Sequence, residues 1–162
     1  MPTMKCSIGE RSIGVKKIDS FEGKYYFLSN FSNSYVYDEL GIEYPTVEHY
    51  FQAAKTLDFG TRLKIAAAPT PGKAKSLGRR INLRSDWNMI KTDVMRSALR
   101  IKFSQPDLRK KLLDTGDAWL EEGNDWHDNF YGNCHCEKCK NIVGENRLGQ
   151  LLMEIREDIK NG

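Results

Sequence analysis

A glutamate on a predicted helix is the first candidate for chemistry in this sequence. Glu48, Gln52 and Lys55 are spaced i, i+4 and i+7, so on a helix they lie along one polar line. Aromatic residues crowd the same stretch, and a carboxylate beside an aromatic wall can hold a proton for delivery because its pKa is raised. A solvated polar face is the alternative interpretation of this spacing. His49 points about 100° away round the helix, so we expect it to be structural.

A second carboxylate, Asp128, lies in the polar segment Trp126–Gly132. Two carboxylates that flank a glycosidic bond can divide the work between them. One stabilises the positively charged sugar or activates water, and the other protonates the leaving group. The sequence alone does not bring Glu48 and Asp128 together, and a plain loop aspartate stays the alternative.

Candidates for binding an anion and a flat base occur further along the chain. Arg79 and Arg80 could clamp a phosphate in bidentate fashion, or could be a solvated basic pair. The segment Gly144–Gly149 enters the last predicted helix, whose free N–H groups could hold an anion. Gly149 could instead only permit close helix packing. Trp87 suits either base stacking or a place in the core.

Three cysteines, Cys134, Cys136 and Cys139, form a CxCxxC cluster. In a reducing compartment such a cluster indicates either a metal site or plain reduced thiols. Structural zinc would need a fourth ligand, for which the sequence offers His127, His135 or Cys6.

The elements that must position these residues fit one domain, 1–162, because 162 residues can bury a core without disulfides. Tyr35–Tyr37 and Ile42–Tyr44 flank a four-residue link and predict a hairpin. Lys24–Phe31 is aromatic-rich and is predicted to be extended. A short strand is expected at 118–121.

Helical periodicity begins after Thr46, a suitable N-cap, and recurs along the rest of the chain. Asn124–Glu145 is polar and is predicted to be a functional loop. The predicted fold class is α+β: a single mainly helical domain with a small N-terminal β region. The remaining helices are predicted at 61–68, 72–77, 86–103, 106–113 and 146–159.

Composition limits the class of partner. The formal net charge of +3 is too weak to demand nucleic acid and is compatible with a small anionic substrate. No apolar run could span a bilayer, and the N-terminus has no secretory signal, so we expect a cytoplasmic protein without a membrane partner. Nothing in the sequence indicates a protein partner.

A set of short motifs occurs in order over about residues 21–160, and its first two segments are the most specific. The set consists of Phe27–Phe31, Tyr44–Lys55, Gly78-Arg79, Trp87, Met95, Lys102-Phe103, Leu120-Glu121, Asp128–Gly132, Gly144–Gly149, Leu152-Met153 and Arg156. These motifs resemble those of the NADAR family, which includes N-glycosidases acting on riboflavin-biosynthesis intermediates.

The resemblance implies hydrolysis of the bond between a phosphorylated ribose and a base, without a cofactor for catalysis. The implied substrates are early ribosylaminopyrimidine intermediates of riboflavin synthesis. By matching positions, the catalytic residues would be Glu48, Asp128 and Trp87. The pocket would be lined by Asn30, Phe31, Gln52, Lys55, Arg79, Tyr131, Asn146 and Gly149.

Two features depart from the family pattern. Tyr131-Gly132 stands where the family often has Trp-Gly; tyrosine can still stack, so the difference bears on base preference. The CxCxxC cluster is absent from the members compared, so we expect it to stabilise the long loop rather than take part in catalysis. Two alternatives stay open: an ADP-ribosyl-guanine glycohydrolase acting on nucleic acid, and a non-catalytic binder of ADP-ribose or a related nucleotide.

Overall fold

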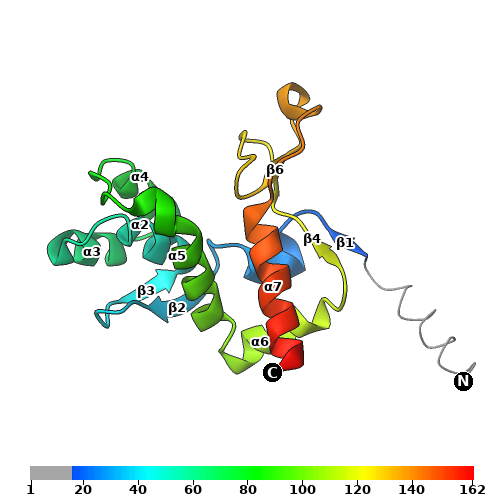
Figure 1. Cartoon of the computed structure of the whole chain (residues 1–162), viewed down its shortest axis with the longest axis horizontal. Coiled ribbons are helices and arrows are strands. Elements are labelled where there is room, and N and C mark those ends of the chain that lie inside the picture. Colours follow the sequence, from blue (N-terminus) through cyan, green and yellow to red (C-terminus); the bar gives the residue numbers. More distant parts are fainter. Residues whose placement is uncertain (1–15) are drawn as a thin grey trace, which may run out of the picture. The chain divides into compact units, whose positions relative to one another are not determined.

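The computed structural model describes residues 16–162, which divide into two compact units. We call Phe27–Arg109 the central unit, and residues 16–26 together with Lys110–Gly162 the terminal unit. The chain is an α+β protein in which helices predominate and the sheets are small (Figure 1). Each unit is described by itself.

The central unit is built on an antiparallel hairpin. Strands β2 (Asn33–Tyr37) and β3 (Glu43–Thr46) pair with Val36 opposite Tyr44, and the register shifts between Asn33 and Val36. Alternate residues of β2 are buried, as expected of a strand with one face on the core. Val36 and Tyr44 are completely buried there.

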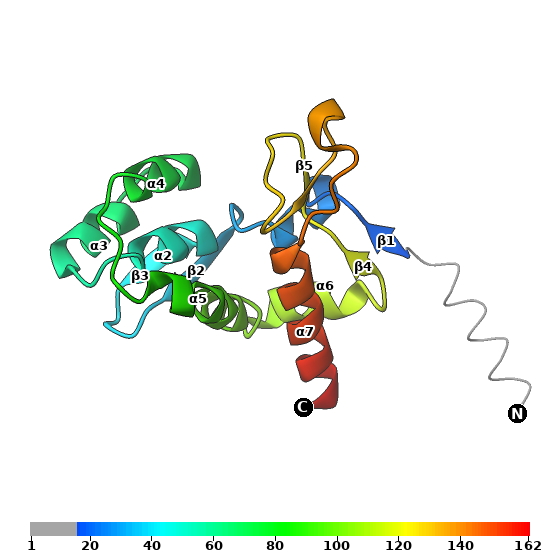
Figure 2. The ribbon, with the colours of Figure 1, turned by 45° about the horizontal axis from the view of Figure 1, so that its top comes forward.

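Helices gather around this hairpin (Figure 2). Helix α2 (Val47–Ala53) follows β3 directly and contacts α3, α4, α5 and both strands, so it is the centre of the unit. Its neighbours are α3 (Phe59–Ala66), α4 (Pro71–Gly78) and α5 (Trp87–Lys102). All seven residues of α2 are buried, which explains why polar side chains on this helix meet protein rather than water.

A buried ion pair joins the hairpin to α3. Arg62, 1% exposed, donates to Asp38 Oδ2 at 3.1 Å, and the Tyr44 hydroxyl donates to the same oxygen at 2.7 Å. Burial works against the charge of Asp38, but these bonds and two backbone N–H groups hold the pKa of Asp38 below its ordinary value. Removing one partner of such a pair would leave an uncompensated buried charge.

Lys102 anchors the segment that carries Asn30 and Phe31. Its Nζ is fully buried and donates to Ser29 O at 2.9 Å and to Ser32 Oγ at 3.0 Å. Burial lowers the pKa of Lys102 to about 7. The amine therefore holds the Ser29 carbonyl on one side and the Ser32 hydroxyl on the other side of two predicted pocket residues.

The terminal unit contains two short parallel pairings and the last helix (Figure 1). Strand β1 (Lys17–Ile18) pairs with β4 (Trp119–Leu120), and β5 (Gly123–Asn124) pairs with β6 (Asn133–Cys134). Helix α7 (Arg147–Asn161) packs on β4 through a stripe of buried leucines and Ile155. In the chain order, helix η2 (Glu137–Cys139) comes between β6 and α7. Helix α6 (Pro106–Asp114) begins in the central unit and ends in the terminal unit.

Most of the predicted elements are confirmed. The hairpin, the N-cap at Thr46, the helices and the strand within 118–121 are all present. The extended prediction for Lys24–Phe31 is wrong, because Gly23–Leu28 forms the 3-10 helix η1, entered through Gly23 at φ 58°. The loop 124–145 holds β6 and η2 rather than lacking regular structure.

None of the helices in residues 16–162 combines the length and the apolar character that a bilayer crossing requires.

Candidate active site

The N-terminus of α2 fixes the orientation of Glu48. Thr46 Oγ1 accepts from His49 N at 3.1 Å and contacts His49 Nδ1 at 2.7 Å, while His49 Nε2 lies 3.0 Å from Ala68 O. A carbonyl only accepts, so Nε2 carries the proton and Nδ1 accepts from the Thr46 hydroxyl. Both ring nitrogens of His49 are thus used structurally, as its position on the helix predicts.

Glu48 is a buried carboxylate with one close hydrogen bond. It is 8% exposed, and its Oε2 accepts from Gln52 Nε2 at 2.6 Å. Burial raises the pKa of Glu48, while the Gln52 bond and the positive charges of Lys75 and Lys55 act in the opposite direction. A carboxyl group in these surroundings can keep a proton closer to neutral pH than an ordinary glutamate.

Lys55 and Lys75 act on this carboxylate, and Arg79 acts on Lys55. The spacing predicted that Lys55 lies on the same helix as Glu48. Lys55 instead lies in the turn after α2, where Lys55 N donates to Gln52 O. Burial lowers the pKa of Lys55; Glu48 opposes this effect, and the charges of Arg79 and Lys75 add to it. Two lysines near one carboxylate, with Arg79 near one of these lysines, make a net cationic site, which suits an anionic ligand.

Helix α4 approaches Gln52 at a glycine. A Cβ built on Gly78 would lie 1.9 Å from Gln52 Oε1, so no larger residue fits without displacing the side chain that holds Glu48. Gln52 Oε1 is buried and has no hydrogen-bond partner in the described structure. The close packing of α4 on α2 therefore depends on glycine at position 78.

We expect Gly78→Ala to lower both stability and turnover. Overpacking of this kind typically costs about 1–3 kcal/mol, and the displaced Gln52 would no longer orient Glu48. Gly72→Ala, on the same helix, is the matched control, because its nearest atom, Thr70 Oγ1, is 3.9 Å away. Denaturant unfolding and kcat/KM are measured for both variants. Equal behaviour of the two would contradict the role given to Gly78.

Aromatic and amide side chains complete the central unit's candidate site. Trp87 is 5% exposed and packs against Phe51 with ring centroids 5.0 Å apart. Asn30 O accepts from Glu48 N at 3.1 Å, which places Asn30 next to the carboxylate-bearing residue. Asn30 Oδ1 is buried without a hydrogen-bond partner in the described residues. Phe31 is half-buried beside it.

In the terminal unit, Asp128 organises a tight turn. Its Oδ1 accepts from Phe130 N and Tyr131 N at 3.0 Å each, while Asn124 Oδ1 accepts from Asp128 N at 3.1 Å. Asn124 Nδ2 donates to Asp128 O at 2.8 Å. The carboxylate is therefore held by its own loop, and it fixes the backbone N–H of Tyr131.

The start of α7 is occupied by protein groups. Asn146 N donates to Gly132 O, Arg147 N to Phe130 O, and Leu148 N to Tyr131 O. The expectation that these N–H groups hold a phosphate is therefore wrong, since loop carbonyls already take them.

The Asn146 side chain at the same helix start holds the end of β4 and the residues that follow it. Asn146 Oδ1 accepts from Glu122 N, and Asn146 Nδ2 donates to Leu120 O. A Cβ on Gly149 would lie 2.1 Å from Leu120 O, so the helix packs on β4 at a glycine. The substrate contacts predicted for Asn146 and Gly149 stay predictions, and the contacts present are structural.

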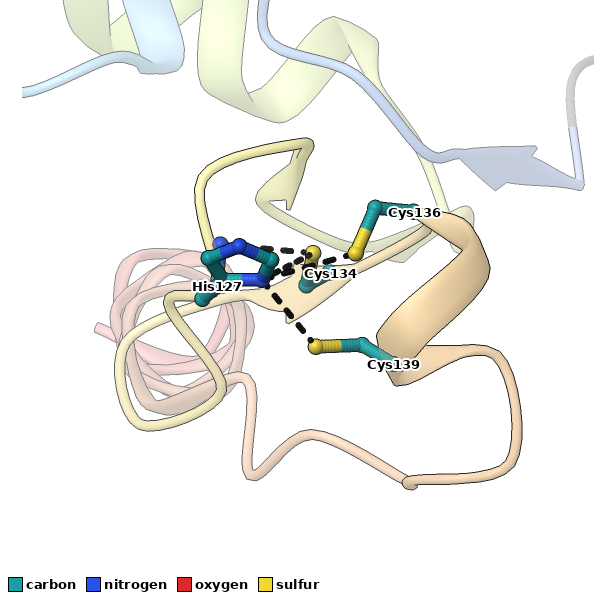
Figure 3. A group of neighbouring side chains, drawn as sticks. All are labelled: His127, Cys134, Cys136 and Cys139. Atoms are coloured by element: carbon teal, nitrogen blue, oxygen red, sulfur yellow. Dashed lines mark hydrogen bonds between the residues drawn. The ribbon is translucent and has the colours of Figure 1, made fainter.

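The cysteine cluster closes around His127 (Figure 3). One ligand atom from each of His127, Cys134, Cys136 and Cys139 lies within 4.8 Å of every other, so the group could hold a metal ion. Burial works against ionisation of Cys134, but backbone N–H groups of Cys136 and His127 lower the pKa of that thiol. His135 instead pairs with Glu121 at 3.2 Å, and Cys6 lies outside the described residues.

The structure thus places the predicted residues in two groups. The central unit holds Glu48, Gln52, Lys55, Arg79, Asn30, Phe31 and Trp87; the terminal unit holds Asp128, Tyr131, Asn146 and Gly149. Lys75 was not predicted, although its charge acts on both Glu48 and Lys55. No local pattern could have found it, because Lys75 acts on Glu48 through the packing of α4 on α2.

The fold and these motifs define a member of the NADAR family. The model of the NADAR domain matches residues 18–160, so the chain belongs to this family. N-glycosidase Npun_R5314 of Nostoc punctiforme is 41% identical over 143 residues, which are 85% of this chain and 87% of that protein.

Other relatives agree with this assignment. N-glycosidase YbiA of Escherichia coli is 43% identical over 122 residues, covering 74% of this chain and 72% of that protein. The NMR structure of Escherichia coli YbiA superposes with a TM-score of 0.75 at 38% identity, covering 91% of this chain and 86% of that one. At this similarity the chain is an N-glycosidase, a hydrolase that acts on a glycosyl substrate.

A plant relative has a more specific name. The chloroplastic riboflavin biosynthesis protein PYRR of Zea mays is 36% identical over 148 residues, which are 81% of this chain but 23% of that much longer protein.

Proposed function

We propose that this N-glycosidase hydrolyses the bond between C1′ of a phosphorylated ribose and an aminopyrimidine base, as in the early intermediates of riboflavin synthesis. The observation that carries the proposal is the buried Glu48, which is held by Gln52 and lies near the charges of Lys55 and Lys75, with Arg79 acting on Lys55. A proton donor beside a cationic group suits a substrate that has a basic leaving group and a phosphate. The name of the maize relative supports the choice of pathway.

Each step of the proposed reaction has a group to perform it. Glu48, whose pKa is raised by burial, gives a proton to the leaving nitrogen as the C1′–N bond breaks. The sugar then gains positive charge, which the Asp128 carboxylate stabilises. Water adds its oxygen to C1′ and loses a proton to a carboxylate. The products are ribose 5-phosphate and the free base.

Binding is assigned to the remaining residues. Lys55 and Arg79 hold the phosphate, because Lys55 is a cation near Glu48 and Arg79 is a second cation near Lys55. Asn30 Oδ1, a buried acceptor without a partner in the described residues, accepts from an amino group of the base. Phe31, Trp87 and Tyr131 supply stacking surfaces. Asn146 contributes by fixing the loop that carries Tyr131, and Gly149 contributes by allowing α7 to pack on β4.

The reaction as proposed uses no cofactor. The cluster of His127 and the three cysteines belongs to the proposal only as a structural zinc site that supplies no chemistry to the substrate. We also propose a cytoplasmic location, because a reducing compartment keeps the free thiols of this cluster available.

The test compares a ribosylaminopyrimidine 5′-phosphate with its dephosphorylated nucleoside. Loss of a charge-assisted phosphate contact typically costs about 1.5–3 kcal/mol, so we expect kcat/KM to be roughly 10- to 100-fold lower for the nucleoside. Arg79→Met should remove most of this difference. Arg80→Met is the matched control, since its neighbour Arg79, and not Arg80, acts on Lys55.

The alternatives appear as other outcomes of the same assay. Release of ADP-ribose from ADP-ribosylated guanine in single-stranded DNA, with no cleavage of the ribosylaminopyrimidine phosphate, would replace the proposed substrate. Tight binding of ADP-ribose by folded protein that cleaves neither substrate would overturn the proposal in favour of a binding module.

A further inference from the structure

The cluster of His127, Cys134, Cys136 and Cys139 has the donor set of a structural zinc site. Three thiolates and one imidazole form a Cys3His set, which closes all four positions of a tetrahedral ion. Two of the cysteines are buried, Cys136 is half-buried and His127 is exposed, so the cluster lies at the edge of the terminal unit.

The distances fit such an ion. Zn–S bonds of about 2.3 Å and Zn–N bonds of about 2.0 Å at the tetrahedral angle place nitrogen and sulfur about 3.5 Å apart. In the structure, His127 Nδ1 lies 3.4 Å from Cys139 Sγ, 3.4 Å from Cys136 Sγ and 4.0 Å from Cys134 Sγ. Figure 3 shows the three sulfur atoms turned toward the same nitrogen. The side chains therefore need only small shifts to share one ion.

The surrounding backbone supports this arrangement. His127 N lies 3.3 Å from Cys134 Sγ, and Asn129 Oδ1 accepts from Cys134 N at 2.9 Å. The parallel pairing of β5 with β6 brings the segment before His127 next to Cys134. Outer contacts of this kind orient ligands in known metal sites.

The position of His127 couples the cluster to Asp128. His127 has φ 69°, a left-handed conformation that costs a non-glycine residue about 1 kcal/mol or more unless other contacts hold it. Asp128 is the next residue, and its carboxylate closes the turn to Tyr131. A ligand bond at His127 would hold this strained backbone from one side while Asn124 holds it from the other.

We propose that His127, Cys134, Cys136 and Cys139 bind one Zn²⁺ as a closed structural site, and that this ion fixes the backbone from which Asp128 projects. The second half rests on the role given to Asp128 in the proposed function. The ion touches no substrate, and His127 is a positioning residue. The segment from β5 to η2 is thereby tied at both ends.

Metal content tests the first half. The full chain, purified without added zinc, should contain one zinc ion per molecule. Cys134→Ser, Cys139→Ser and His127→Asn should lose it, whereas His135→Asn and Cys6→Ser should keep it as matched controls. Co²⁺ exchanged into wild type should give the visible absorption of tetrahedral thiolate ligation. Absence of metal and of this absorption in wild type would overturn the site.

Turnover and unfolding test the second half. His127→Asn and Cys139→Ser should melt at lower temperature than wild type, and kcat should fall roughly 10- to 100-fold, because small displacements of a reacting group cost this much. Wild type stripped by a chelator should lose kcat and regain it with Zn²⁺ but not with Mg²⁺. Metal-free protein with unchanged kcat would overturn the coupling while leaving the zinc site in place. If the protein does not cleave the proposed substrate, the metal content and the melting temperatures still test the zinc site.

Discussion

Glu48→Gln is expected to lower kcat by about 100- to 10,000-fold, the usual loss when a general acid or base is removed. The substitution keeps the shape of the side chain and an oxygen that can accept from Gln52 Nε2, whose bond to Glu48 Oε2 is 2.6 Å long. The fold should therefore survive, and the loss should reside in chemistry rather than in binding. Single-turnover kinetics with the ribosylaminopyrimidine phosphate would measure it.

The pH dependence gives a second readout of the same variant. If Glu48 acts as the proton donor, kcat/KM of wild type falls as pH rises through its raised pKa, and Glu48→Gln removes this limb. Stability moves in a related way. Because the folded pKa lies above the unfolded value of 4.5, wild type loses stability relative to Glu48→Gln as pH rises from 4.5 through the folded pKa.

Glu43→Gln is the control for Glu48→Gln. Glu43 is an exposed carboxylate in β3, only five residues earlier, so its loss changes net charge equally without touching the buried site. Near-normal turnover by Glu48→Gln, or an equal loss in both variants, would remove Glu48 from the mechanism.

Asp128→Asn is expected to reduce kcat to a similar degree, by about 100-fold or more, because it removes the charge that stabilises the developing positive sugar. Asparagine keeps an oxygen at the position of Oδ1, so it can still accept from Phe130 N and Tyr131 N. The turn should remain intact, and the melting temperature should stay close to that of wild type.

Asp128→Ala separates charge from architecture. Alanine removes the two accepting contacts as well as the charge, so it should also lower the melting temperature. If Asp128 is catalytic, both variants lose activity to a comparable extent although only alanine disturbs the turn. An active Asp128→Asn beside an inactive Asp128→Ala would show that the carboxylate matters only for the loop.

Periodicity and capping predicted the elements that carry Glu48. The apolar positions after Thr46 and the hairpin before it are local signals, and tertiary packing did not override them. The prediction that Lys24–Phe31 is extended was wrong because aromatic residues favour strands only where a partner strand pairs with them. Gly23 with its positive φ instead starts a short 3-10 helix.

The candidate site was predictable where one helix carries it and less so where packing assembles it. Glu48 and Gln52 share a helix face, and their contact follows from the spacing. Lys75 acts on Glu48 only because α4 packs on α2 at Gly78. The sequence pattern of neither helix predicts this contact. The fourth member of the cysteine cluster likewise depended on the pairing of β5 with β6.

The buried amine of Lys102 makes proton binding part of the folding equilibrium. Its pKa is about 7 in the folded chain against an ordinary value of 10.5. Between these pH values the unfolded chain binds more protons at this side chain, so unfolding takes up a proton from solution. The contribution of Lys102 to stability consequently improves as pH rises from about 7 to 10.5 and is lost as pH falls back. The cost of burying this amine, which holds the segment that presents Asn30 and Phe31, is therefore smallest in alkaline solution.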